Sequence, residues 1–249
     1  MLLEGKNAII YGGGGTIGGA VARTFAREGA TVFLAGRTPA RLEVVAKQIR
    51  AAGGRAETAA VDALDEKMVD EHADAVAAAE GSIDISFNLI SQGDVQGTPL
   101  VEMRLQDFMQ PVITTVSAMF ITARAAARHM IKRRSGVILA FGGYGDPVPN
   151  LGGLQVAFGA IESFRRNLAC ELGPHGIRVV TLQTGGVPDS IPESFAGREA
   201  LTRDLVGKTM LNRAATLDDV GNAAVFAASD WARTMTATAL NITCGSKAD

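Results

Sequence analysis

Residues 7–28 read NAIIYGGGGTIGGAVARTFARE, and this stretch joins an apolar strand pattern to a helix pattern through four consecutive glycines. Glycine lets the backbone turn tightly and lie close to a bound group. The N-terminus of the helix that follows offers free N–H groups and the positive end of the helix dipole. A glycine-rich turn between the first strand and the first helix therefore predicts a dinucleotide-binding turn, and the alternative is a merely flexible loop.

The alternation that begins in this stretch continues to the end of the chain. Strands that alternate with helices predict a doubly wound α/β fold, with a mainly parallel sheet of seven strands covered by helices on both faces. No linker, repeat or low-complexity segment interrupts the pattern, so we expect residues 1–249 to form a single domain. The predicted strands are residues 7–11, 31–35, 55–61, 83–90, 136–141, 177–183 and 239–243, and the predicted helices are residues 18–28, 40–52, 66–79, 107–132, 156–172 and 217–228.

One segment, residues 184–209, departs from the alternation. It has no clear apolar period, and it contains the pair Gly185-Gly186 together with Pro188 and Pro192. Irregular segments of this kind between regular elements often cover a binding site. We expect a substrate lid here, and its apolar residues favour a substrate that is partly apolar.

Charge and composition exclude several classes of function. A formal net charge of −2 and a pI near 6.0 argue against nucleic acid or an anionic membrane as the main partner. The two cysteines do not suggest a disulfide framework, and the three histidines are isolated, so no metal site is expected. We find neither an 18-residue apolar run nor a signal peptide, and we therefore expect a cytoplasmic protein that acts on a small molecule.

The ends of the next strands indicate which cofactor the turn would hold. The second strand ends in Gly36-Arg37-Thr38, where an acid selective for NAD would usually stand. Arg37 can instead form hydrogen bonds to a 2′-phosphate, which favours NADP over NAD. The alternative is that Arg37 is simply an exposed arginine at the end of a strand. Asp62, at the end of the third strand, can accept from an adenine amino group, and Asn88, at the end of the fourth, can tie neighbouring strands together.

Several further motifs carry a resemblance to a known family. They are NLACELGP at residues 167–174, GIRV at 176–179, NR at 212–213, LDDV at 217–220 and LNI at 240–242. Together with the first turn they resemble the short-chain dehydrogenase/reductase family over nearly the whole chain. The resemblance implies a Rossmann-like fold, a nicotinamide cofactor and a homotetramer. The expected cofactor-binding residues are Gly12, Gly14, Gly15, Thr16, Ile17, Gly18, Arg37, Thr38, Asp62, Ala63 and Asn88.

The catalytic pattern of that family is absent from this sequence. Family members carry Tyr-x-x-x-Lys in the fifth helix, a Ser after the fifth strand and an Asn in the fourth helix. Alignment on the shared helix motif puts Leu154 at the Tyr position and Phe158 at the Lys position. Gly143 stands at the Ser position, and Thr115, whose hydroxyl we expect to bond back to its own helix, stands at the Asn position.

No other residue offers itself clearly as a proton donor. The layout of enoyl reductases would place the Tyr at Leu151 and the Lys again at Phe158, so it is not fulfilled either. Tyr144 is the nearest phenol, and the alternative is that it merely lines the cleft. Asp146 and Glu162 are further candidates, although we expect Glu162 to face solvent. The turn also departs from the family, because Thr16 replaces its middle glycine, and Asp189 stands where the family has a Thr.

Three hypotheses about function follow. The first is an NADP(H)-binding oxidoreductase that works without the usual Tyr and Lys, on an enoyl or polycyclic substrate. The second is a catalytically silent binding protein or the partner subunit of a hetero-oligomer. The third is a non-redox enzyme, a cyclase or dehydratase, that reuses the pocket. Saturable binding of NADPH separates the first hypothesis from the other two.

Overall fold

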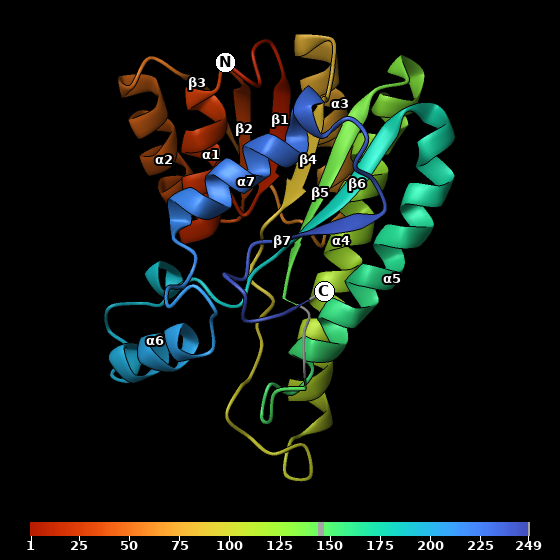
Figure 1. The fold of residues 1–249 in the computed structure, drawn as a ribbon. Coiled ribbons are helices and arrows are strands. Elements are labelled where there is room, and N and C mark those ends of the chain that lie inside the picture. The colour runs from red at the N-terminus through yellow and green to blue at the C-terminus, as the bar shows by residue number, and fades with distance from the viewer. Residues whose placement is uncertain (144–146, 249) are drawn as a thin grey trace.

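The computed structural model describes residues 1–143 and 147–248, and its centre is one parallel sheet of seven strands (Figure 1). The strand order is β3-β2-β1-β4-β5-β6-β7, and every neighbouring pair is parallel. The strands are β1 (Asn7–Tyr11), β2 (Thr31–Gly36), β3 (Arg55–Ala60), β4 (Ile85–Asn88), β5 (Gly136–Gly142), β6 (Ile177–Gln183) and β7 (Thr238–Asn241). The predicted doubly wound fold is confirmed.

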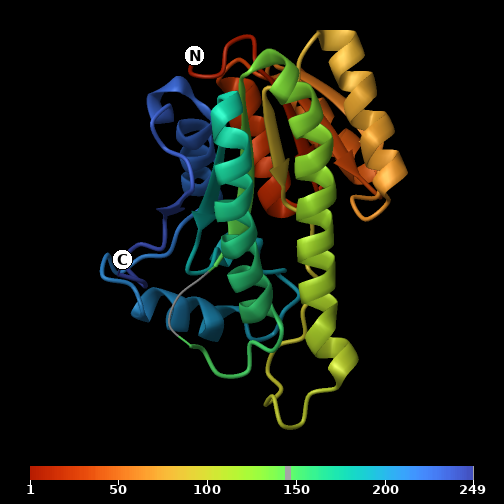
Figure 2. The same cartoon turned by 90° about the vertical axis from the view of Figure 1, so that its right-hand side faces the viewer.

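Helices cover both faces of the sheet, as Figures 1 and 2 show together. One layer consists of α1 (Thr16–Arg27), α2 (Pro39–Ala51) and α7 (Leu217–Ala228). The other consists of α3 (Glu66–Glu80), α4 (Leu105–Arg133) and α5 (Leu154–Leu172). Apolar side chains fill the space between each layer and the sheet, and β1 is buried along its whole length because it lies between both layers.

The strand order reverses direction beside β1. The chain winds outward from β1 through β2 to β3 and then crosses back to β4 on the other side of β1. In open parallel sheets a crevice forms where the order reverses, at the carboxyl ends of the strands. The topology therefore brings the turn after β1 and the ends of β2, β3 and β4 to one edge.

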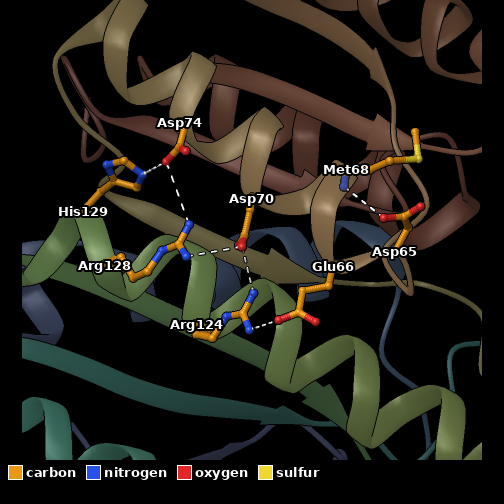
Figure 3. Close-up of polar contacts among 8 residues, drawn as sticks. All are labelled: Asp65, Glu66, Met68, Asp70, Asp74, Arg124, Arg128 and His129. Carbon is orange, nitrogen blue, oxygen red and sulfur yellow. Dashed lines mark hydrogen bonds and ion pairs between the residues drawn. The ribbon is translucent and has the colours of Figure 1, made fainter.

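The helices α3 and α4 are joined by a ladder of charged side chains (Figure 3). Asp70 accepts hydrogen bonds from Arg124 at 2.9 Å and from Arg128 at 3.2 Å, and Arg124 also pairs with Glu66. Ion pairs at a surface contribute little singly but more as a network. The ladder therefore fixes α4, whose lower end passes beyond the sheet edge in Figure 2, against α3.

The segment between β6 and α7 contains more regular structure than its sequence predicts. A 3₁₀ turn spans Pro188–Ser190, and the helix α6 spans Arg198–Gly207. The expectation that residues 184–209 are irregular is therefore wrong for α6. No residue of this helix is buried, so it lacks the apolar period on which the sequence reading depended. Among the described residues, no helix combines the length and the apolar character that crossing a bilayer requires.

The contact between α1 and α7 yields a test of the packing. A Cβ at Gly221 of α7 would collide with the Thr24 hydroxyl of α1 and lie 2.9 Å from the Thr24 Cβ. Thr24 is buried and its hydroxyl donates to the Ala20 carbonyl, so it has little room to move. Gly221→Ala should lower the free energy of unfolding by about 1–3 kcal/mol, as overpacking does, when measured by urea denaturation.

Gly159 of α5 provides the matched control, because a Cβ there would meet nothing within 4 Å. Gly159→Ala should leave the free energy of unfolding unchanged or raise it by up to about 1 kcal/mol, the gain that alanine gives in a helix. Equal effects of the two substitutions would contradict the close approach of α1 and α7.

Candidate functional site

A pocket of about 310 Å³ lies at the carboxyl edge of the sheet, where the strand order reverses. Four chain segments line it: the turn after β1 and the segments that follow β2, β3 and β4. Side chains from the first half of α4 close the remaining side. Among the expected cofactor-binding residues, the pocket brings together Gly12, Gly14, Gly15, Arg37, Thr38, Asp62 and Ala63.

The glycine turn is shaped by close backbone contacts. Gly12 has a φ of 78°, and a Cβ there would collide with the carbonyl of Leu89 at the end of β4. A Cβ at Gly18 would collide with the carbonyl of Gly12, so the first turn of α1 lies directly on the loop. Both positions therefore require glycine. The turn holds the start of α1 against the ends of β1 and β4.

The N-terminus of α1 points its backbone at this pocket without a competing side chain. Gly15 is the N-cap and makes no side-chain hydrogen bond, and the first turn carries no acid. Thr16, Ile17 and Gly18 form that first turn and do not line the pocket itself, although they were expected at the cofactor. An uncapped helix N-terminus beside a glycine turn can bind an anion such as a pyrophosphate.

Two arginines stand at the side of the pocket formed by β2 and α2. Arg37 follows β2, and Arg41 lies one helical turn further on, with its Cβ close to Gly14. Neither arginine forms an ion pair within the described part of the chain. The sequence analysis missed Arg41, although it stands at the start of a helix that was predicted to begin just after Arg37.

The acidic and amide residues of the site lie in different places. Asp62 lines the pocket, and its Oδ1 accepts from the Leu64 backbone N–H at 3.0 Å, which leaves its second oxygen for other donors. Asn88 lies outside the pocket lining and ties β4 to α4 through its contact with Thr122 at 3.4 Å. The sequence analysis also missed Gln92, Gln110 and Thr114, which line the pocket. Gln92 lies beside Ser91 in the segment after β4, and the positions of Gln110 and Thr114 depend on how α4 packs.

Apolar groups stand at the positions where the resemblance implies catalytic side chains. Leu154 is the first residue of α5 and is 9% exposed. The Phe158 ring lies beside Gly143, where a Cβ would come within 3.3 Å of it. Thr115 is buried, and its hydroxyl has no hydrogen-bond partner among the described residues, so the expected bond back to its own helix is wrong. None of these four groups donates or accepts a proton readily.

The structure gives a different result for each of the other candidate acids. Tyr144 and Asp146 lie outside the described residues. Glu162 does not face solvent as expected, because it is 9% exposed and pairs with Arg165 at 2.6 Å. Asp189 accepts from the Leu217 N–H at the start of α7, at 3.4 Å, so its carboxylate is turned to a helix N-terminus.

Tyr11, the phenol in the described part of the chain, lines the pocket but is 1% exposed. Its ring meets the His72 ring edge-on, with centroids 6.3 Å apart. Burial, with a contribution from the Asp70 carboxylate, raises the pKa of Tyr11 above its usual value. Burial lowers the pKa of His72 to about 4. Both rings are therefore neutral at pH 7, and Tyr11 is a poor proton donor.

Metal chemistry has no visible support in this part of the molecule. Within residues 1–143 and 147–248, no three His, Cys, Asp or Glu side chains come together in a way that could hold a metal ion. The chemistry available at the pocket is therefore the binding of anions by the turn and the arginines, and hydrogen bonding by Asp62 and the amides.

Comparison with known proteins gives relatives along nearly the whole chain. Residues 14–247 match the family profile described as enoyl-(acyl carrier protein) reductase. The chain is 30% identical to gluconate 5-dehydrogenase from Gluconobacter oxydans (strain 621H) over 229 residues, which cover 91% of this chain and 89% of that protein.

Solved structures give the same result. A short-chain type dehydrogenase/reductase from Mycobacterium marinum superposes with a TM-score of 0.86 at 26% identity, covering 99% of this chain and 97% of its own. A short chain dehydrogenase from Burkholderia cenocepacia J2315 in complex with NADP superposes with a TM-score of 0.86 at 28% identity, covering all of both chains. The protein belongs to the short-chain dehydrogenase/reductase family of oxidoreductases, whose cofactors are nicotinamide nucleotides.

Proposed function

We propose that the protein is an oxidoreductase that binds NADP(H) and works without the Tyr and Lys usual in its family. The observation that carries this proposal is the pair Arg37 and Arg41 at the pocket, both free of ion-pair partners in the described residues. A guanidinium fork matches the oxygens of a phosphate monoester, which NADP carries on its ribose and NAD does not. The relative from Burkholderia cenocepacia, solved in complex with NADP, supports the same choice.

The rest of the pocket fits the remaining parts of the same cofactor. The glycine turn and the uncapped start of α1 suit a pyrophosphate, because a side chain at Gly12 would fill the space against Leu89. Asp62 has an oxygen left to accept from an adenine amino group. The cofactor would supply the hydride, and the protein would supply its binding and orientation.

The proposed substrate class follows from the absence of a proton donor at positions 154 and 158. Leu154 and Phe158 cannot protonate a carbonyl oxygen or stabilise the negative charge that develops on it. Reduction of a conjugated double bond depends less on a proton donor of the protein, because its carbon can take a proton from water after the hydride arrives. We therefore propose an enoyl or polycyclic substrate. Exposed apolar residues of the lid segment support a partly apolar one, since Phe195 is 50% exposed and Leu201 is 39% exposed.

A second candidate is a catalytically silent subunit that binds the cofactor without turning it over. The position of the Phe158 ring favours it, because the ring stands beside Gly143 where the family has polar groups. The two candidates differ in one measurable respect. Oxidation of NADPH in the presence of any enoyl substrate supports the enzyme, and saturable binding without turnover supports the silent subunit.

The cofactor preference is tested by fluorescence titration with NADPH and NADH. The unaltered protein should bind NADPH about 10–100-fold more tightly, the factor expected for hydrogen bonds to a charged group. Arg37→Ala should remove most of this preference and Arg41→Ala part of it, while the affinity for NADH stays the same.

The matched control is Arg233→Ala. Arg233 is an exposed arginine that lies with Gly136 and Ile177 at the starts of β5 and β6, the opposite edge of the sheet. This substitution should change neither affinity. Equal affinity of the unaltered protein for the two cofactors would refute the proposal of NADP preference.

The missing acid is tested with simple ketones and β-ketoacyl thioesters, whose NADPH-dependent reduction should be negligible in the unaltered protein. The triple variant Gly143→Ser, Leu154→Tyr, Phe158→Lys should raise the rate by about 10²-fold or more, the contribution of a general acid. The control triple carries Leu154→Phe instead, which differs by one hydroxyl and should stay inactive. Fast ketone reduction by the unaltered protein would mean that another group donates the proton.

We also propose that the protein is a homotetramer of the kind its family implies. The side-by-side helices α4 and α5 carry exposed apolar side chains, among them Ile113 at 57%, Phe120 at 48% and Val156 at 48%. A helix that is apolar outside its core-facing stripe needs a further partner. Both cysteines are free, which suits the reducing cytoplasm, where we propose that the protein works.

Light scattering at micromolar concentration tests the assembly. A mass near four times 25.9 kDa is expected. Phe120→Glu should lower that mass, because it puts a charge into an apolar contact, whereas Lys132→Glu at the exposed end of α4 should not. A monomer for the unaltered protein would refute the proposal.

A further inference from the structure

A second cavity, of about 490 Å³, lies between α5 and the edge strand β7 and shares no residue with the pocket described above. One face of α5 forms one wall, with Gly159, Glu162 and Arg166. The other residues that line this groove are Gln183 at the end of β6, Thr238 and Ala239 of β7, and Lys247 near the C-terminus. Cavities of 300–1,000 Å³ are the usual size for small-molecule sites.

Glu162, which lines the groove, belongs to a buried ion pair that has open hydrogen-bonding capacity. Glu162 is 9% exposed and Arg165 is 4% exposed, and the Glu162 Oε2 accepts from the Arg165 Nη2 at 2.6 Å. The other carboxylate oxygen, Oε1, has no hydrogen-bond partner in the described residues, nor have Nε and Nη1 of Arg165. A buried polar atom without a hydrogen-bond partner destabilises the fold. A ligand that donates a hydrogen bond to Oε1 would remove this destabilisation.

The charges around the groove favour an anion. Arg166 is exposed and forms no ion pair within residues 1–143 and 147–248, and Lys247 lines the same groove with its ammonium 3.4 Å from the Gln183 Oε1. Because Arg165 already balances Glu162, the guanidinium of Arg166 adds a positive charge at the groove. A neutral hydroxyl suits the free Glu162 oxygen better than an ammonium, since a further cation beside Arg165 would be repelled.

We propose that the groove between α5 and β7 is a second ligand site, for a small carboxylate that carries several hydroxyl groups. Arg166 and Lys247 bind the carboxylate. Glu162 accepts from a hydroxyl through Oε1, and Gln183 and Thr238 hydrogen-bond to the others. The site is independent of the dinucleotide pocket, and it depends on the Glu162–Arg165 pair.

Isothermal titration calorimetry with three six-membered-ring compounds tests the chemistry. Glucuronate carries both the carboxylate and the hydroxyls, glucose only the hydroxyls, and cyclohexanecarboxylate only the carboxylate. Glucuronate should bind at least about tenfold more tightly than either of the others, since each lacks one set of hydrogen bonds. Binding should be the same with and without saturating NADPH. Absence of glucuronate binding at 10 mM, or loss of it when NADPH is added, would overturn the proposal.

Two substitutions assign the groups. Arg166→Gln should weaken glucuronate binding about tenfold, and Lys132→Gln, which removes a charge from the exposed end of α4, should not change it. Glu162→Gln should weaken the binding of glucuronate and leave that of cyclohexanecarboxylate unchanged. If Glu162→Gln fails to fold because Arg165 loses its partner, Arg166→Gln still decides. Glucuronate binding that is insensitive to Arg166→Gln would place the ligand elsewhere and refute the site.

Discussion

The contact between the loop after β1 and the first turn of α1 is the constraint on which the rest of the site depends. The Gly12 carbonyl lies where a Cβ of Gly18 would stand, and Gly12 itself lies against the Leu89 carbonyl at the end of β4. The loop, the start of α1 and the end of β4, which is distant in the chain, thus meet through backbone atoms with no room for side chains. This meeting point directs the uncapped N-terminus of α1 to the edge where the strand order reverses. The turn departs from the family pattern at Thr16, yet Thr16 begins the helix and leaves this contact intact.

Around that turn the site is rich in groups that bind and poor in groups that transfer protons. Arg37, Arg41 and Asp62 line the pocket, whereas apolar Leu154 and Phe158 stand where the resemblance to the family implies a Tyr and a Lys. The Tyr11 phenol does not compensate, because burial and the nearby Asp70 carboxylate keep it protonated. The chemistry proposed for the protein follows from this imbalance. Hydride transfer depends mainly on positioning, and the absence of a proton donor that we propose would suit substrates whose protonation needs little help.

Charged groups are found on α5 further along the helix than Leu154 and Phe158. Glu162 and Arg165 bring a charged pair into a helix face that packs on the sheet, where apolar side chains such as Ile161 and Ala169 are the rule. Such a pair contributes little to stability on balance, because desolvation offsets the attraction between the charges. Because Glu162 lies beside Arg166 and Lys247 in the groove, the pair can take part in binding a ligand there. The proposed dinucleotide site thus lies at the strand reversal, and the proposed second ligand site lies at the edge strand.

The sequence by itself determined the sheet, both helical layers and the position of the glycine turn. These features depend on local apolar periods and on glycine, and β1, β6 and α7 were predicted to the residue. The tertiary structure alone decided what depends on packing between distant segments. The helix α6 was missed because it buries nothing, Arg41 and Gln110 reach the pocket only through the placement of α2 and α4, and Glu162 is buried although its spacing suggested an outer face. A periodic pattern indicates which face of a helix is apolar. It does not indicate that a charged residue on another face, such as Glu162, pairs with Arg165 and is buried with it.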